Sequence, residues 1–224
     1  MRVRHIAVIA TLLTGSSAFA QSTPSTPAPD SAHAAPTLAG QPDPKAWSVD
    51  ASAYLYFVND GRDYVQPTLR ADRGPLHLEG RYNYEDLETG SAWVGWNFSV
   101  GREVVFDFTP MIAGVFGNTS GFATGYEGVL RWKRLELDSE SEYLFASGDR
   151  SDNFFYNWSQ LTLSPAERFF LGFVVQRTRA YEAEREVQRG LLAGFSRENR
   201  SVSAVLFNPD DDQPMFVLVL DLAF

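Results

Sequence analysis

Apolar residues alternate with other residues, in segments of roughly ten, from Trp47 to Phe224, and this pattern constrains the fold more than any other feature. Successive side chains of a β-strand point to opposite faces, so a period of two predicts strands. No apolar run after residue 20 approaches the ~20 residues of a membrane-spanning helix. A strand crosses a bilayer with about 9–11 residues, and a bilayer accepts strands only as a closed barrel. The pattern therefore predicts an all-β protein, either a barrel or a soluble sandwich.

Residues 1–20 have the features of a cleaved secretory signal peptide. Arg2 and Arg4 give a positively charged start, a short apolar core follows, and Ala18 and Ala20 form a small-x-small cleavage site. A membrane anchor is the alternative, but the apolar run is too short to span a bilayer. An exported chain with weak alternating segments is typical of a transmembrane β-barrel rather than a sandwich.

Residues 21–46 are rich in Pro, Ala, Ser and Thr and show no apolar period. Such a segment cannot bury enough apolar surface to fold, so it predicts a disordered periplasmic leash. This leash is either idle or in contact with a periplasmic partner or peptidoglycan. Residues 47–224 then form the third part of the chain, the barrel.

Turn residues divide the barrel region into twelve predicted strands. Their bounds are 47–58, 64–72, 75–85, 91–100, 103–117, 121–132, 134–146, 153–163, 168–179, 187–197, 201–208 and 214–224. The connections alternate between short ones and longer, more polar ones, which predicts short periplasmic turns and longer outer loops. The turn near Trp132 contains no Gly, Pro or Asn. Ten or fourteen strands therefore remain as alternatives.

The predicted strand 75–85 indicates which face points inward. Leu76, Leu78, Tyr82 and Tyr84 alternate with charged residues. Arg or Lys on the lipid face costs ~2–4 kcal/mol at mid-membrane, so the charged face must line the lumen. The same argument gives the predicted lumen-lining charges: Arg70, Glu79, Arg81, Asp107, Glu127, Arg131, Lys133, Glu136, Asp138 and Glu140.

A lumen with charges of both signs has two interpretations. The charges form the selectivity lining of a narrow pore, or they are ion pairs that fill a closed barrel. Barrels of about eight strands are filled by side chains and those of 16–18 leave a channel, so twelve lies between. Inward Tyr56 and Trp93 narrow the bore. From residue 153 on the inner face is ambiguous: Arg177 has the phase of Phe169, which predicts a bulge or a strand end above the membrane.

Several classes of function are excluded by composition. The chain has no Cys, which removes disulfides, thiolate metal sites and Cys nucleophiles. A net charge of −9 argues against nucleic acid, whose phosphates need a basic face. No hydrolase, zinc or phosphate-loop motif is present, and His77 is expected to pair with lumen charges such as Glu79. The acidic run 210–212 is expected to be a solvated loop. We therefore predict no catalytic residues, no cofactor and no metal.

The last predicted strand has an apolar face that ends on an aromatic residue: Phe216, Leu218, Leu220, Leu222 and Phe224. Together with the leader and the twelve alternating segments, this strand makes residues 47–224 resemble the Gram-negative outer-membrane β-barrel proteins, without a named subfamily. The resemblance implies contact with outer-membrane lipid and lipopolysaccharide. It also implies that barrel-assembly machinery binds the last strand during insertion.

The inward charges favour a narrow porin-like channel for ions or small polar solutes. The alternative is a closed, non-conducting barrel that acts as a structural, adhesion or envelope-tethering protein through its loops or its leash. The resembled class also includes a phospholipase, which needs a Ser-His pair that faces lipid. Because His77 is predicted to face inward, we predict no enzyme. The solute and the oligomeric state stay open.

Overall fold

The computed structural model describes residues 46–58, 62–148, 153–180, 186–212 and 214–224. The predicted signal peptide and nearly all of the predicted leash lie outside these residues. No helix in the described chain is long and apolar enough to cross a membrane. The described chain contains thirteen strands: β1 Ser48–Phe57, β2 Tyr64–Arg73, β3 Leu76–Tyr82, β4 Thr89–Trp96, β5 Phe98–Gly101, β6 Val104–Gly117, β7 Gly121–Trp132, β8 Leu135–Ala146, β9 Phe154–Ala166, β10 Phe169–Ala180, β11 Glu186–Arg197, β12 Arg200–Phe207 and β13 Met215–Ala223.

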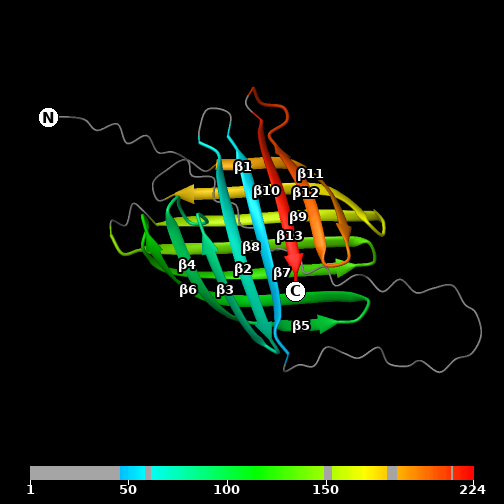
Figure 1. The fold of residues 1–224 in the computed structure, drawn as a ribbon, viewed down its shortest axis with the longest axis horizontal. Coiled ribbons are helices and arrows are strands. Elements are labelled where there is room, and N and C mark those ends of the chain that lie inside the picture. Colours follow the sequence, from blue (N-terminus) through cyan, green and yellow to red (C-terminus); the bar gives the residue numbers. More distant parts are fainter. Residues whose placement is uncertain (1–45, 59–61, 149–152, 181–185, 213) are drawn as a thin grey trace, which may run out of the picture.

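The strands form one closed antiparallel ring (Figure 1). The ring closes where β1 pairs with β13, so that Asp50 lies opposite Ala223 and Phe57 opposite Phe216. β4 and β5 are two parts of one strand interrupted at Asn97, because both pair with successive stretches of β6. The ring therefore has twelve spanning strands, which confirms the predicted fold and strand count.

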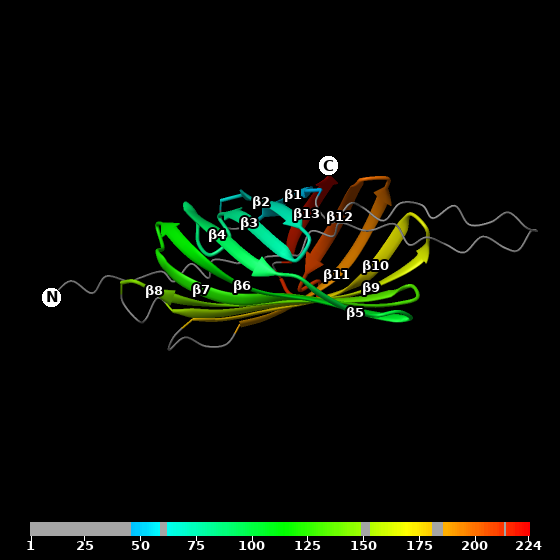
Figure 2. The same cartoon turned by 90° about the horizontal axis from the view of Figure 1, so that it is seen from below.

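The barrel is flattened, as Figure 2 shows, with β1–β4, β12 and β13 in one wall and β6–β9 in the facing wall. In Figure 1 the strands of the two walls cross at a steep angle, as expected for strands that tilt in a closed barrel. Flattening shortens the distance between the walls, so side chains from one wall reach those of the other.

The connections at the two ends of the barrel differ in length. At one end, five turns of two residues each join the strands, at 74–75, 102–103, 133–134, 167–168 and 198–199. The connections at the other end are longer, as between Phe57 and Tyr64. The turn near Trp132, which contains no Gly, Pro or Asn, is a two-residue turn in which Lys133 adopts a φ of 55°. Short turns mark the periplasmic end in such barrels, so this pattern orients the chain.

Alternation along the strands separates an apolar outer surface from a polar interior. On β8, Leu137 is 41% exposed whereas its neighbour Asp138 is 2% exposed. Exposed apolar side chains recur around the ring and form an outer belt, for example Val65, Leu69, Ile112, Leu130, Leu161, Leu191 and Leu220. Because lipid accepts apolar groups and rejects charge, this belt is the lipid-facing surface.

Strands β9 and β10 resolve the ambiguity in the sequence. Phe169 and Leu171 are exposed on the outer surface, and Arg177 continues their phase. The register shifts between the Phe169–Ala166 pair and the Leu171–Leu163 pair, near the periplasmic end, but it is continuous from Leu171 to Arg177, so no bulge separates these two residues. Arg177 therefore points outward.

Candidate functional site

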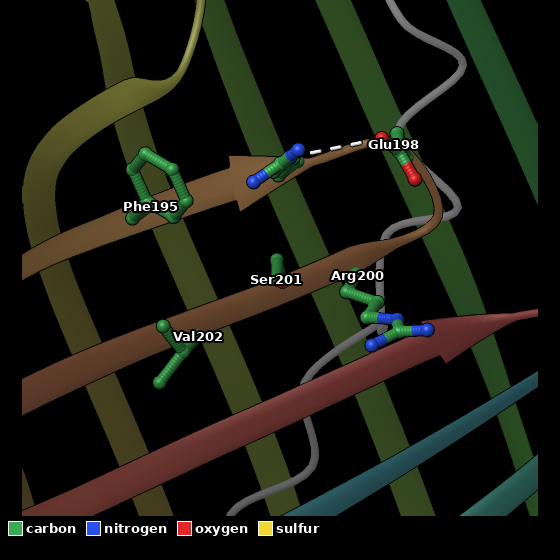
Figure 3. Close-up of a pocket in the computed structure, with 6 residues that line it drawn as sticks. Phe195, Glu198, Arg200, Ser201 and Val202 are labelled. Atoms are coloured by element: carbon green, nitrogen blue, oxygen red, sulfur yellow. Dashed lines mark ion pairs between the residues drawn. The ribbon is translucent and has the colours of Figure 1, made fainter.

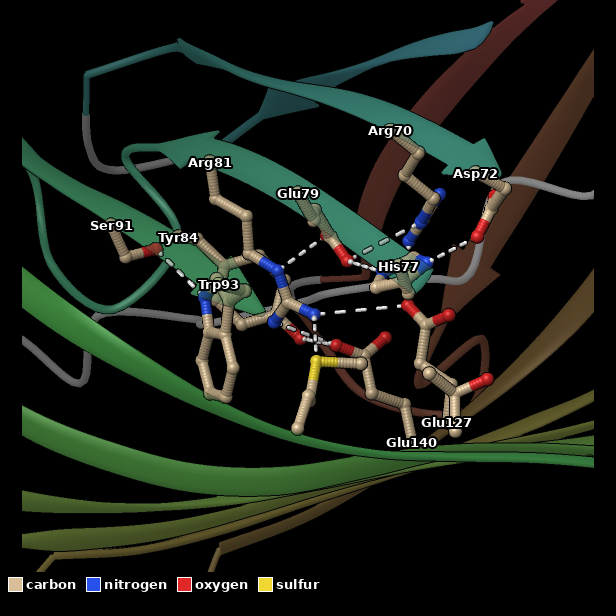
Figure 4. Close-up of polar contacts among 12 residues, drawn as sticks. Arg70, Asp72, His77, Glu79, Arg81, Tyr84, Ser91, Trp93, Glu127 and Glu140 are labelled. Atoms are coloured by element: carbon tan, nitrogen blue, oxygen red, sulfur yellow. Dashed lines mark hydrogen bonds and ion pairs between the residues drawn. The ribbon is translucent and has the colours of Figure 1, made fainter. Parts of the chain in front are cut away.

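Ionisable side chains from two parts of the wall meet inside the barrel (Figure 4). They come from strands on which alternate residues share a face, which is why residues two apart point together. β3 and β8 are not neighbours in the ring, because β4, β6 and β7 lie between them, so contacts between β3 and β8 cross the lumen. We call this group the lumen ion cluster; it consists of Arg70, Asp72, His77, Glu79, Arg81, Glu127, Glu140 and Glu142.

Arg81 on β3 is the centre of the lumen ion cluster, and its side chain is only 1% exposed. Its Nε lies 2.5 Å from Oε1 of Glu79, and its Nη1 lies 2.8 Å from Oε1 of Glu140 on β8. The guanidinium also lies over two aromatic rings, 4.1 Å from the centre of Tyr84 and 4.6 Å from that of Trp93. Such cation–π contacts strengthen when the cation is desolvated. One side chain therefore joins the two walls and narrows the lumen.

Arg70 and His77 extend the cluster toward the periplasmic end. Nη2 of Arg70 lies 2.9 Å from Oε1 of Glu127, and its Nε lies 3.4 Å from Oε2 of Glu79. Nδ1 of His77 lies 2.9 Å from Oδ1 of Asp72, and its Nε2 lies 3.2 Å from Oε2 of Glu79. Both ring nitrogens of this buried histidine therefore face carboxylates inside the barrel.

His77, Glu79 and Glu127 also have the donor types of a metal site, and their ligand atoms lie within 4.8 Å of one another. However, Arg70 contacts both glutamates, and Arg81 contacts Glu79 as well. An arginine side chain stays charged at any ordinary pH, so a divalent cation here would sit beside fixed positive charge. The arrangement is better described as an ion-pair network than as a metal site.

A second ionic group lies nearer the periplasmic end and is half-buried. Arg131 on β7 forms an ion pair with Asp107 on β6, and its Nε lies 2.7 Å from Oε2 of Glu136 on β8. The register of the sheet brings the three together, since Arg131 pairs directly with Glu136 and Val105. We call these three residues the mouth cluster.

Carboxylates outnumber basic groups inside the barrel. Among the described residues, six buried carboxyl side chains face two buried arginines and one histidine: Asp50, Glu79, Glu85, Asp138, Glu140 and Glu142 against Arg70, Arg81 and His77. Asp138 is 2% exposed, and in the described chain neither of its carboxylate oxygens accepts a hydrogen bond. It lies on β8 between Glu136 and Glu140, opposite Val129 and Gln160. The β8 side of the lumen is therefore strongly acidic.

The connection between β3 and β4 folds into the barrel and contributes to the cluster. Tyr84 donates a hydrogen bond to Glu140 and packs edge-on against Tyr156 of β9, with ring centres 5.9 Å apart. We expected Tyr84 on the lipid face, and this expectation is wrong, because Tyr84 is 2% exposed. The cause is local: Asn83 adopts a φ of 57°, which ends β3 and breaks the alternation. Glu85 beside it is also buried, and burial raises its pKa.

The ten predicted lumen charges fall into distinct places. Five belong to the lumen ion cluster, three form the mouth cluster, and Asp138 lies between the two groups. Lys133 differs: it is exposed in the β7–β8 turn, and its Nζ lies 4.8 Å from the ring centre of Trp132. The positive φ at Lys133 turns the chain there, so the phase of β7 does not continue to it.

Asp72 is a member of the cluster that we did not predict. It lies two residues after Arg70 and shares its inward phase, which is a signal in the sequence, but Asp72 is the last residue of the predicted strand 64–72 and was not included among the lumen charges. The apolar face of the last strand lies as expected on the outer surface, where Phe216 is 40% and Leu220 43% exposed. Its role in assembly stays a prediction.

A hollow of about 440 Å³ lies at the periplasmic rim, beside the β11–β12 turn (Figure 3). Phe195, Ser201 and Val202 line it together with an ion pair in which Nε of Arg197 lies 3.6 Å from Oε1 of Glu198. The two charged side chains are 66% and 79% exposed, so water competes with any ligand there. The lumen is therefore the stronger candidate site.

A closed twelve-stranded antiparallel barrel with an apolar belt and a charged interior has the architecture of an outer-membrane β-barrel. No protein-family model and no curated protein sequence match this chain. Among solved structures, the KdgM porin matches 79% of this chain and 99% of its own, with 9% sequence identity and a TM-score of 0.54. The KdgM porin in complex with disordered oligogalacturonate gives the same values. The Acinetobacter baumannii outer membrane protein Omp33 matches 80% of this chain and 98% of its own, at 12% identity and a TM-score of 0.42. At such identities the likeness concerns the fold alone.

Proposed function

We propose that this barrel is a narrow channel for ions or small polar solutes, and that it prefers cations. The observation that carries the proposal is the surplus of carboxylates inside, and above all Asp138 with its unpaired oxygens. Burying a charge is costly unless an opposite charge accompanies it, so unpaired lumen carboxylates attract protons or mobile cations. A row of acidic side chains along a pore favours the passage of cations over anions.

The size limit of the proposed channel follows from the groups that cross the lumen. Arg81 joins β3 to β8, and Tyr84 fills space between them beside Tyr156. These side chains narrow the lumen, so we expect the proposed channel to admit small solutes only. The bridge also places a positive charge beside the acidic row, so a passing cation meets both attraction and a barrier.

The fold likeness to the KdgM porin does not extend to its ligand. Oligogalacturonate is a chain of sugar acids and therefore carries one negative charge per unit. In this barrel such a polyanion would meet Asp138, Glu140 and Glu142, which repel it in an interior where charges are weakly screened. We therefore expect cationic or neutral solutes here rather than acidic oligosaccharides.

Single-channel recording in a planar bilayer under a KCl gradient tests the proposal. The reversal potential should have the sign of cation preference in the wild-type protein. Asp138→Asn should shift it toward zero, whereas Asp210→Asn, in an exposed loop where Asp210 is 64% accessible, should leave it unchanged. A reversal potential of the opposite sign would exclude the preference for cations.

A closed barrel that acts through its loops or leash is the second candidate, and the bridge made by Arg81 favours it. Stable insertion without current from wild-type protein, with steps appearing in Arg81→Ala protein, would mean that the lumen is closed in the resting state. The function would then belong to the longer connections at the outer end.

A further inference from the structure

A polar patch interrupts the apolar outer belt at the middle of β7, β8 and β9. Its residues share the outward phase because they alternate with inward ones, as Ser139 and Ser141 do on either side of Glu140, although Ser141 and Gly128 are themselves buried. The sheet register places them in two adjacent rows: Gly128 pairs with Ser139 and Ser139 with Ser159, while Tyr126 pairs with Ser141 and Ser141 with Asn157. We call these six residues the outer patch.

The outer patch is joined by hydrogen bonds. Oγ of Ser139 lies 3.4 Å from the Tyr126 hydroxyl and 3.3 Å from Oγ of Ser159. Ser159 donates to Oδ1 of Asn157 over 3.3 Å, and Nδ2 of Asn157 donates to the Glu140 carbonyl over 2.9 Å. These side chains therefore form a connected polar surface that spans three strands.

The setting of the patch makes it unusual. The next row toward the periplasm is wholly apolar, since Leu130 pairs with Leu137 and Leu137 with Leu161. The next row toward the outside contains Tyr143 beside Phe155. The patch therefore lies at mid-height, where a lipid-facing surface is expected to meet acyl chains. On β13 the outward residues at mid-strand, such as Leu218 and Leu220, are apolar.

Acyl chains cannot form hydrogen bonds, so polar groups that face them lose the partners that water would give. The internal bonds satisfy part of the patch, but hydroxyl and amide groups have more than one bonding position each. A second protein surface with hydrogen-bonding groups would satisfy the rest. The small side chains of Ser139 and Ser159 would also let that surface approach closely, as small residues do between membrane segments; Gly128 itself is covered by the rings of Phe106 and Phe108.

We propose that the outer patch is the contact surface for a second copy of this chain. The patch is electrostatically complementary to itself, because each hydroxyl and the Asn157 amide can both donate and accept. A two-fold axis along the membrane normal, between β8 and β9, brings the same surface of two barrels together, as in an isologous dimer. Ser139 and Ser159 of one copy then lie near Ser159 and Ser139 of the other, and the polar groups leave the lipid.

The absence of Cys from the chain allows a clean test. Single variants Ser139→Cys and Ser159→Cys introduce one thiol into the patch with little change in shape. Ala53→Cys is the matched control, because Ala53 lies in the middle of β1, on the far side of the ring from β8 and β9. Each purified variant is refolded in lipid vesicles and treated with a short bis-maleimide. The difference in gel mobility between heated and unheated samples shows whether the barrel is folded.

We expect Ser139→Cys and Ser159→Cys proteins to shift from monomer to dimer mass, and Ala53→Cys protein to stay at monomer mass. Equal cross-linking of all three would mean random collision, and no cross-linking of folded patch variants would mean that a copy of this chain does not cover the patch; either result overturns the proposal. Light scattering in detergent adds an independent measurement. Wild-type protein should have dimer mass and Asn157→Leu protein monomer mass, whereas a monomeric wild-type protein would contradict the interface.

Discussion

The two halves of the lumen differ in how their interiors are filled. On β2, β3, β7 and β8 charged inward residues are joined in ion pairs, whereas of the buried charged residues that the structure describes none lies on β9–β12. There the interior is uncharged and combines apolar and aromatic side chains with buried polar ones such as Gln160 and Gln176; Trp158 lies edge-on against Phe207, with ring centres 5.5 Å apart, and Val205 is fully buried. One barrel thus combines an ionic half, which gives the lumen its field, with a packed half, which holds its shape.

The ionic half should show the largest effect when one charge is removed. Arg81→Met leaves Glu140 and Glu142 without the cation that pairs them, while Glu79 keeps its contacts with Arg70 and His77. Breaking a buried ion pair by removing one partner costs about 3–5 kcal/mol of unfolding free energy. Urea unfolding of the barrel in lipid vesicles, followed by tryptophan fluorescence, measures this loss.

The matched control for this change is Arg189→Met, because the Arg189 side chain is 70% exposed and forms an ion pair with the exposed loop residue Asp210, at 3.1 Å. An exposed pair contributes about 0–1 kcal/mol, so its loss should hardly move the unfolding midpoint. Similar losses for Arg81→Met and Arg189→Met would show that the lumen ion cluster does not stabilise the barrel, and the contrast between the halves would fail.

The packed half should be sensitive to the opposite change, the introduction of a polar group. Val205 on β12 is fully buried and lies between Leu192 and Val217 in the register of the sheet. Val205→Thr keeps the shape but buries a hydroxyl, which costs about 1–3 kcal/mol where no partner is at hand. The same urea titration measures it, with Val187→Thr at an exposed position as the control. If Val205→Thr leaves the unfolding free energy unchanged, the new hydroxyl has a hydrogen-bond partner such as water, and this half of the interior is hydrated.

The mouth cluster lies in the ionic half but is half-exposed, which predicts a smaller effect on stability. Arg131→Gln removes the partner of Asp107 and Glu136, whose side chains are 34% and 20% exposed. Water screens such a pair, so we expect a loss of about 0–1 kcal/mol. The cation preference should rise instead, because a positive charge leaves the mouth, and the reversal potential under a salt gradient measures this. A lower cation preference would contradict the assigned position.

The same difference explains what the sequence could predict. On β2, β3, β7 and β8 charged residues mark one face, so the phase of Glu79 or Glu140 was enough to predict the interior. On β9–β12 no charged residues mark the inward face, and a residue such as Trp158 gives no sign of which side it faces. The order of the strands and the alternation of short and long connections followed from the apolar period and the turn residues, but the exact turn lengths did not: the predicted connection 164–167 is a two-residue turn at 167–168. The contact of Arg81 with Glu140 did not, because it depends on the flattening of the barrel, and Tyr84 was misplaced because one left-handed residue, Asn83, reverses the phase.

The smallest expected effect is a pH dependence at the border of the ionic half. Glu85 lies in the connection between β3 and β4 and is 2% exposed, and burial raises its pKa above the ordinary value near 4.5. A carboxyl whose pKa is higher in the packed state favours packing when protonated. The packed connection should therefore be most stable below the ordinary pKa, and this extra stability should be lost as the pH rises through the raised value.

Limited proteolysis of the folded barrel at a series of pH values measures this dependence. Cleavage within the β3–β4 connection should increase as the pH rises through the raised pKa of Glu85. Glu85→Gln cannot ionise, so its cleavage should stay near the low-pH level throughout, while Glu88→Gln, in the same connection and outside the buried set, should behave as wild type. If wild-type and Glu85→Gln proteins are cleaved alike at every pH, the ionisation of Glu85 does not control the packing of the connection. The charges of the ionic half would then affect the strands but not the packing of the β3–β4 connection.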